Sequence, residues 1–233
     1  MKNILVFDSS SSNLFISGEV NGAKIEFCRN YEKSKMSVEM PGDMMWLRDV
    51  LAGSENIRVV AGAGPGSFTG IKSGLSFFLA LVYSLGIKKV ETVSSSRLFA
   101  VFSKAPSGVS KIVAIPFNKG EYFISVYDRE QNPLMEDVFM RFPFEGFADK
   151  ANVLNNLEAV IVSPVDVCEE LVSELGRFFK IKGIYAGSLV FEQEKMPAPG
   201  QLKTVDIPSE PMILNYVTHP ANIDGNCDIY VKN

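Results

Sequence analysis

The succession of predicted strands and helices constrains the fold of this chain more than any other feature of its sequence. In the first half, apolar runs and an Asn21-Gly22 hairpin turn indicate three antiparallel strands, followed by helix, strand, helix and strand. The second half repeats that order. The predicted strands cover residues 3–8, 14–20, 23–29, 57–62, 90–93, 111–117, 121–128, 133–140, 159–163 and 181–187, and the predicted helices cover residues 36–51, 67–85, 144–155 and 168–179, with a further short helix from the serines at 94–96.

Two copies of one βββαβα-type unit indicate an α/β protein with a duplicated ribonuclease-H-like fold, the fold of actin-like ATPases. The joint lies in a stretch with Pro, Gly and Ser at residues 104–110. We therefore predict an N-terminal domain of residues 1–105 and a C-terminal domain of residues 106–233. From about residue 192 the sequence is rich in proline and lacks periodicity, so we expect that part to run along the surface.

Composition narrows the classes of function. The 233 residues carry a formal net charge of -4 and no run of Lys or Arg, which argues against nucleic-acid binding by this chain alone. The three cysteines are far apart and predict neither a disulfide framework nor a zinc site. The apolar run at the N-terminus is too short for a secretory signal, and no run reaches the roughly 18 apolar residues of a membrane span. We expect a cytoplasmic protein with no membrane partner.

A glycine-rich turn precedes the long apolar helix at residues 67–85. The turn does not match a P-loop, because Ile71 separates Gly70 from Lys72. It does not match the dinucleotide-binding fingerprint either, because Ser67 stands where the third glycine is needed. The glycines therefore need an explanation other than a bound phosphate.

Small residues continue at helical spacing after this turn. Each glycine inside a helix costs about 1 kcal/mol relative to alanine, and the close approach of another backbone is the usual compensation. That backbone could belong to a helix of the same domain or to a second protein chain. The preceding helix carries a stripe of methionines, whose flexible side chains suit a partner surface. The stripe in the second helix consists of Gly70, Ser73, Gly74, Phe77, Ala80, Leu81 and Ser84, and the methionines are Met36, Met40 and Met44.

The segment GPGSFTGIKSG at residues 64–74 resembles the signature GPGSFTG-x-R-x-G of the TsaB (YeaZ) family. Weaker similarities follow in the family's order along the chain. They are Asp8-Ser9-Ser10 for the opening D-T-S, Glu39 and Pro41 in the region of H-S-E-x-L-L-P, Gly120-Glu121 for D-A-R-x-G-E-V-Y, and Glu210-Pro211 for E-P-x-Y-L-R.

The chain also departs from the family pattern at several positions. Lys72 replaces the arginine of the signature, which keeps the charge but loses the two-pronged hydrogen-bonding geometry of a guanidinium. The other departures are Met36 or Ser37 in place of the histidine, Pro116-Phe117-Asn118 in place of D-A-R, and Ile213 and Asn215 in place of the last Tyr and Arg.

The resemblance implies a non-catalytic subunit. TsaB-like proteins pair with a TsaD-type catalytic subunit, and with a TsaE-type ATPase, to make threonylcarbamoyl adenosine in tRNA. The resemblance places the pairing surface on the two helices of the first domain, and a homodimer could use the same helices. It implies contact with tRNA only through the complex, no tightly bound cofactor, and ATP or ADP at the interface with the partner. The interface residues it predicts are Met36, Met40, Met44, Gly70, Lys72, Ser73, Gly74, Phe77 and Leu81.

Two alternatives to the scaffold function remain open. The first is an active actin-like ATPase or small-molecule kinase, in which Asp8 after the first strand would position a metal-bound phosphate with help from Ser9 and Ser10. Such a site would also need an acidic residue of the second domain, for which Asp128 and Asp166 are available. The second is a glycoprotease-like metallohydrolase. The single histidine, His219, argues against it, because one histidine cannot supply a pair of metal ligands on one helix. We assign no catalytic residue and no metal ligand.

Overall fold

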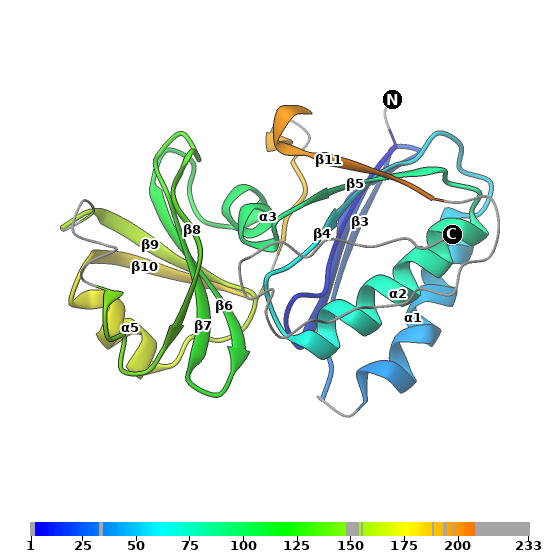
Figure 1. The fold of residues 1–233 in the computed structure, drawn as a ribbon. Helices are drawn as coiled ribbons and strands as arrows, with labels where there is room; N and C mark the ends of the chain where they lie inside the picture. Colours follow the sequence, from blue (N-terminus) through cyan, green and yellow to red (C-terminus); the bar gives the residue numbers. More distant parts are fainter. Residues whose placement is uncertain are drawn as a thin grey trace.

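Two mixed β-sheets form the framework of the protein (Figure 1). The structure is a computed structural model that describes residues 3–32, 35–147, 154, 156–187, 189–192, 195–197 and 199–207. The first sheet consists of β1 (Ile4–Asp8), β2 (Asn13–Val20), β3 (Ala23–Asn30), β4 (Arg58–Gly62), β5 (Lys89–Val93) and β11 (Lys203–Asp206). The second consists of β6 (Ser110–Asn118), β7 (Glu121–Tyr127), β8 (Pro133–Arg141), β9 (Glu158–Ser163) and β10 (Lys180–Ala186).

The two sheets share one topology. In the first, β1 is antiparallel to β2 and β2 to β3, while β1, β4 and β5 run parallel. In the second, β6, β7 and β8 are antiparallel neighbours, while β6, β9 and β10 run parallel. The spatial order is β11-β5-β4-β1-β2-β3 in one and β10-β9-β6-β7-β8 in the other. The protein therefore has the duplicated ribonuclease-H-like fold that the order of elements predicts.

Four α-helices in the described part of the chain cover the sheets (Figure 1). Helices α1 (Met36–Leu51) and α2 (Phe68–Ser84) lie side by side on the outer face of the first sheet. Helix α3 (Ser95–Phe102) lies between the two sheets and is buried along its whole length. Helix α5 (Glu169–Gly176) covers the outer face of the second sheet. A short 3-10 helix, η3 (Pro199–Gln201), precedes β11.

Strand β1 shows why the first apolar run is continuous. Leu5 and Phe7 pack into the cluster beneath α1 and α2, and the ring of Phe7 stacks on Phe78 at 3.9 Å between centroids. Ile4 and Val6 point to the other face and join the cluster around α3. A strand buried on both faces needs apolar residues at successive positions, whereas a half-exposed strand alternates.

The structure corrects several predicted boundaries. Residues 203–206 form β11, which pairs with β5 of the first sheet, although they follow the joint predicted at residues 104–110. Helix α1, by contrast, has the predicted bounds of residues 36–51 and continues through Pro41. Helix α5 ends at Gly176, earlier than predicted. The predicted helix 144–155 lies partly outside the described residues. All residues after 207, including His219, also lie outside them.

No helix in the described part of the chain is long and apolar enough to cross a membrane.

Candidate functional site

The glycine turn packs against the turn that follows β1. The Ser67 backbone N–H donates a hydrogen bond of 2.6 Å to the Ser10 carbonyl oxygen. A Cβ added to Gly66 would lie 2.0 Å from that same oxygen, and one added to Gly70 would lie 2.3 Å from the Ser9 carbonyl oxygen. A Cβ on Gly74 would lie 2.0 Å from Ser9 Oγ. The backbone that the small residues approach is therefore the chain's own Ser9–Ser11 turn.

This packing corrects the predicted partner interface. Six of the nine predicted residues are buried inside the chain, because the stripe at spacings of three and four faces the chain's own sheet and the β1–β2 turn. These six are Met36, Met40, Met44, Gly70, Gly74 and Leu81, so the face that they share is not exposed in this structure. Ser73 and Phe77 are half-buried, and Lys72 is exposed.

Asp8, Ser9 and Ser10 are buried beneath the glycine turn. Asp8 Oδ1 accepts hydrogen bonds from Ser10 N at 2.9 Å and Ser10 Oγ at 2.7 Å. Its second oxygen, Oδ2, is buried without a hydrogen-bond partner among the described residues. Burial raises the pKa of Asp8, against the lowering effect of the nearby Ser95 and Ser10 hydroxyls. Because Asp8 is fully buried, a nucleotide phosphate cannot reach its carboxyl in this structure, which disfavours a kinase or ATPase site at Asp8.

A cleft of about 970 Å³ opens between the two units, next to this turn. Its walls include Ser12 and Asn13 from one unit and Phe117 and Asn118 from the other, whereas Asp8 does not line it. Asn13 Nδ2 donates a hydrogen bond of 2.6 Å to the Pro164 carbonyl oxygen and so ties the units together. The cleft has the volume of a small-molecule site.

The two carboxylates that could complete a phosphate site at Asp8 lie apart. Asp166 lines the cleft. Asp128 instead holds the β7–β8 turn, where its Oδ1 accepts a hydrogen bond of 2.7 Å from the Asn132 backbone N–H. The structure therefore does not bring Asp8 and Asp128 to one site.

Helix α1 carries a second apolar face, turned away from the core. Val38, Met45, Trp46 and Val50 are each at least 45% exposed, and helical spacing places them within an arc of about 140° opposite the buried methionines. The Trp46 ring stacks on Phe27 of β3, with centroids 5.3 Å apart.

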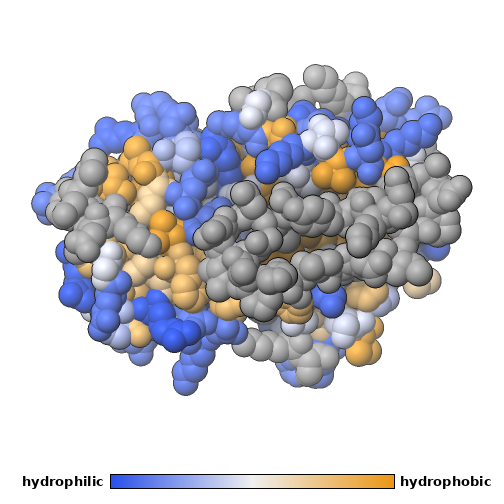
Figure 2. Space-filling view, viewed as in Figure 1, coloured by the Kyte–Doolittle hydropathy of each residue, from blue (hydrophilic) through white to orange (hydrophobic). Residues whose placement is uncertain are grey.

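Helix α2 extends this apolar face. Phe68 at its start and Tyr83 near its end are 49% and 42% exposed. Lys72 Nζ lies 5.5 Å above the Phe68 ring, so the cation belongs to the same surface. In Figure 2, apolar side chains reach the surface at the lower right, over the end of the molecule that α1 and α2 occupy in Figure 1. We call Val38, Met45, Trp46, Val50, Phe68 and Tyr83 the outer face.

The sequence analysis missed the outer face, although a signal for it was present. The buried stripe of α1 accounts for residues at positions 36, 40, 44, 47 and 51. Val38, Met45, Trp46 and Val50 fall outside that stripe, and apolar residues on both sides of a surface helix indicate a second contact.

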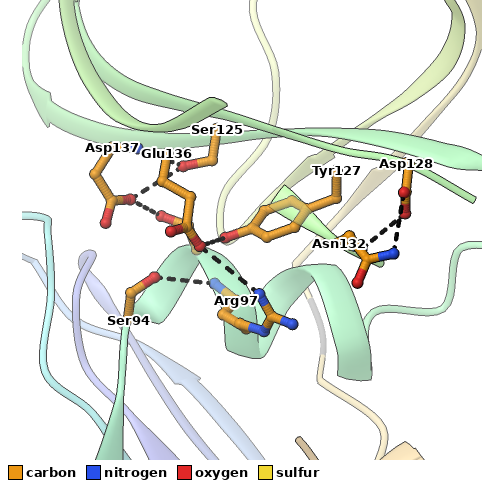
Figure 3. Close-up of polar contacts among 9 residues, drawn as sticks. Ser94, Arg97, Ser125, Tyr127, Asp128, Asn132, Glu136 and Asp137 are labelled. Atoms are coloured by element: carbon orange, nitrogen blue, oxygen red, sulfur yellow. Dashed lines mark hydrogen bonds and ion pairs between the residues drawn. The ribbon is translucent and has the colours of Figure 1, made fainter. Parts of the chain in front are cut away.

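A polar network between α3 and strands β7 and β8 joins the two units (Figure 3). Asp137 of β8 accepts hydrogen bonds from Ser96 of α3 and from Ser125 of β7, the latter at 3.0 Å. Tyr127 donates a hydrogen bond to Glu136 at 3.3 Å, and Arg97 lies 3.8 Å from that same carboxylate. Burial raises the pKa of Asp137, against the lowering effect of the Ser96 and Ser125 hydroxyls. No sequence motif pointed to this network.

Within the described residues, no group of three or more His, Cys, Asp or Glu side chains could hold a metal ion.

Comparisons with known proteins support the fold. No family model matches the sequence, and neither does any curated protein. The structure is similar to YeaZ from Pseudomonas aeruginosa, with a TM-score of 0.55 and 17% identity over 81% of this chain and 86% of that one. It is also similar to an uncharacterized protein with similarity to peptidase YeaZ from Pseudomonas aeruginosa, with a TM-score of 0.50 and 18% identity over 76% and 91%. The chain therefore has a YeaZ-like fold.

Proposed function

We propose that this chain is a TsaB-like scaffold subunit that docks to a TsaD-type catalytic subunit. In that complex, together with a TsaE-type ATPase, it would support the formation of threonylcarbamoyl adenosine in tRNA. The observation that carries the proposal is the outer face, an exposed apolar surface on the helix pair of a YeaZ-like fold.

The composition of the outer face suits a protein partner. Exposed apolar patches on soluble proteins mark interaction sites, and interface cores are enriched in aromatic residues and methionine. Trp46, Phe68 and Tyr83 supply three aromatic anchors, and Met45 supplies an adaptable one. Lys72, Arg48 and Asp49 are exposed beside them and fit the polar rim of such an interface.

The ligands of the complex follow from this assignment. Asp8 is fully buried, so we place ATP or ADP at the interface with the partner and not at that carboxyl. We likewise assign tRNA contact to the assembled complex, since the chain is acidic overall.

The test measures docking to the TsaD-type protein of the same organism by size exclusion and calorimetry. Val38→Glu and Met45→Glu each place a charge on the outer face, so we expect each to weaken binding at least tenfold. Ile184→Glu and Leu134→Glu are matched controls, because these residues are 47% and 45% exposed on strands of the second unit. All four variants should retain the wild-type melting temperature.

The outcomes separate the possibilities. Equal loss of binding in the control variants, or none in Val38→Glu and Met45→Glu, would show that the outer face is not the docking site. Assembly of the chain with itself alone, lost in the same two variants, would assign the outer face to a homodimer and count against the heteromeric complex. Tight ATP binding by the isolated chain that is abolished in Asp8→Asn would favour the kinase alternative.

A further inference from the structure

A second cavity, of about 350 Å³, lies where α3, the start of β6, the β7–β8 turn and residues 195–197 meet. No residue of the outer face lines it. Among the described residues that line it, four are basic and one, Glu130, is acidic. The basic residues are Arg97, Lys111, Arg129 and Lys195.

Two of these cations are almost fully buried. Arg97 is 8% exposed and Lys111 is 2% exposed. Burying a cation without a close counter-charge is costly, so buried Lys and Arg are normally paired. Lys111 Nζ donates only to the Ala100 carbonyl oxygen among the described contacts, and that oxygen carries no full charge.

Arg97 is paired only weakly, since its guanidinium carbon lies 5.7 Å from the centroid of the Tyr127 ring. Its Nε is buried and has no hydrogen-bond partner among the described residues. Its carboxylate neighbour, Glu136, lies 3.8 Å from a terminal guanidinium nitrogen, beyond hydrogen-bond distance. Figure 3 shows the Arg97 side chain leaving α3 beneath the Tyr127 ring, toward the side where Asn132 lies. Asn132 also lines the cavity.

The remaining cations face the same space. Lys195 pairs with Glu192 at 2.8 Å, and Arg129 is exposed at the β7–β8 turn. The pKa of Lys111 is lowered to about 8, mainly by burial and also by the charge of Lys195, while the charge of Glu192 opposes this. The positive charges of Lys111 and Lys195 repel each other, and a bound anion with more than one negative charge would reduce that repulsion.

We propose that this cavity binds a small phosphate dianion, either inorganic phosphate or a small phosphomonoester. Arg97, with its planar guanidinium, and Lys111, with its compact ammonium group, are the buried cations of this site. Arg129 and Lys195 complete the site nearer the surface of the protein. The volume is at the lower end of small-molecule sites, which suits a phosphate carrying a small organic group.

The test titrates the full chain with inorganic phosphate and with glycerol 3-phosphate, at constant ionic strength set with chloride. We expect saturable one-to-one binding by calorimetry and a rise in melting temperature. The double variant Arg129→Gln/Lys195→Gln should weaken binding at least tenfold without unfolding the protein, since neither side chain is in the core. Arg177→Gln/Lys182→Gln is the matched control, because it removes the same charge from the residue after α5 and from β10, away from the cavity.

Lys111→Met tests the buried cation directly. It should abolish binding without changing the circular dichroism spectrum of the protein. If Lys111→Met does not fold, the double variant Arg129→Gln/Lys195→Gln is the test of the proposal. Tighter binding of glycerol 3-phosphate than of phosphate identifies an ester as the ligand, and the reverse identifies inorganic phosphate. The proposal is overturned if neither anion binds saturably, or if the control double variant loses as much affinity as the cavity variant.

Discussion

Gly70 of α2 lies directly against Ser9 of the turn after β1. A Cβ at Gly70 would be 2.3 Å from the Ser9 carbonyl oxygen and 2.6 Å from the Ser11 carbonyl oxygen, closer than real Cβ atoms approach backbone. Asp8, the last residue of β1, directly precedes this turn, and its carboxyl accepts two hydrogen bonds from Ser10. The glycines of the loop therefore fix the position of α2 relative to the end of β1.

Gly70→Ala should lower the free energy of unfolding by about 1–3 kcal/mol, since backbone atoms rather than a flexible side chain would have to move. Gly42→Ala is the matched control in α1, where a Cβ would meet nothing within 4 Å. It should raise stability by up to about 1 kcal/mol through helix propensity. Urea unfolding measures both. A Gly70→Ala variant as stable as wild type would show that the turn does not need the close approach.

Two methionines of α1 distinguish the core from the outer face. Met40 is fully buried and Met45 is 58% exposed. Met40→Ala should cost about 2–5 kcal/mol of stability because it leaves a cavity, whereas Met45→Ala should stay within about 0.5 kcal/mol. Thermal unfolding followed by circular dichroism is the measurement. Similar losses in both variants would contradict the assignment of the two faces.

Asp8→Asn should change how stability depends on pH. Burial raises the pKa of Asp8 above its ordinary value of 3.8, so the folded chain binds this proton more tightly than the unfolded chain does. The stabilisation from Asp8 is thus fully present below pH 3.8 and is lost as the pH rises through the higher, folded-state pKa. Asparagine does not ionise.

The stability of Asp8→Asn relative to wild type should therefore increase as the pH rises from the ordinary carboxyl pKa of 3.8 toward neutral pH. Urea titrations across that range, at fixed ionic strength, measure the difference. A difference that stays constant or decreases with pH would mean that the pKa of Asp8 is not raised in the folded protein.

Asp137 joins the two units by accepting hydrogen bonds from Ser96 and Ser125 (Figure 3). It also adopts a left-handed backbone conformation, with φ of 52°. Asp137→Ala would leave both hydroxyls without their acceptor and put alanine in a conformation that Asp and Asn tolerate better, so we expect a loss of about 2 kcal/mol or more.

Asp137→Asn serves as the control, because it keeps one acceptor oxygen and the tolerance for that backbone. It should lose about 1 kcal/mol or less. Chemical unfolding compares the two. An equal loss of stability in both variants would show that the hydrogen bonds from Ser96 and Ser125 to the side-chain oxygen do not stabilise the protein.

Much of the fold could be predicted from local patterns. The three-strand opening, α1, α2 and the serine cap of α3 all appear in the structure, and Ser94 Oγ accepts a hydrogen bond from the Arg97 backbone N–H. These features depend on neighbours within a few residues, which periodicity and capping preferences describe. Strand β11 was not predicted, because its residues show no alternation of apolar and polar side chains. They form a strand because they pair with β5.

The surfaces could be predicted only in part. A small-residue stripe shows that something approaches closely, but not whether that neighbour is the chain itself or a partner. The Ser9–Ser11 turn lies far from Gly70 in sequence, so its position depends on how β1 and α2 pack. The same limit hid the basic cavity, whose four cations come from separate segments of an acidic chain.

The sequence by itself determined the order of strands and helices, the duplicated unit and the need for close backbone contact at the glycine turn. Only the tertiary structure decided which backbone fills that contact, which methionines are core, and which carboxyl is sealed from solvent. The reason is physical: the period of a pattern depends on the local geometry of one element, whereas exposure and pairing depend on distant segments that folding brings together.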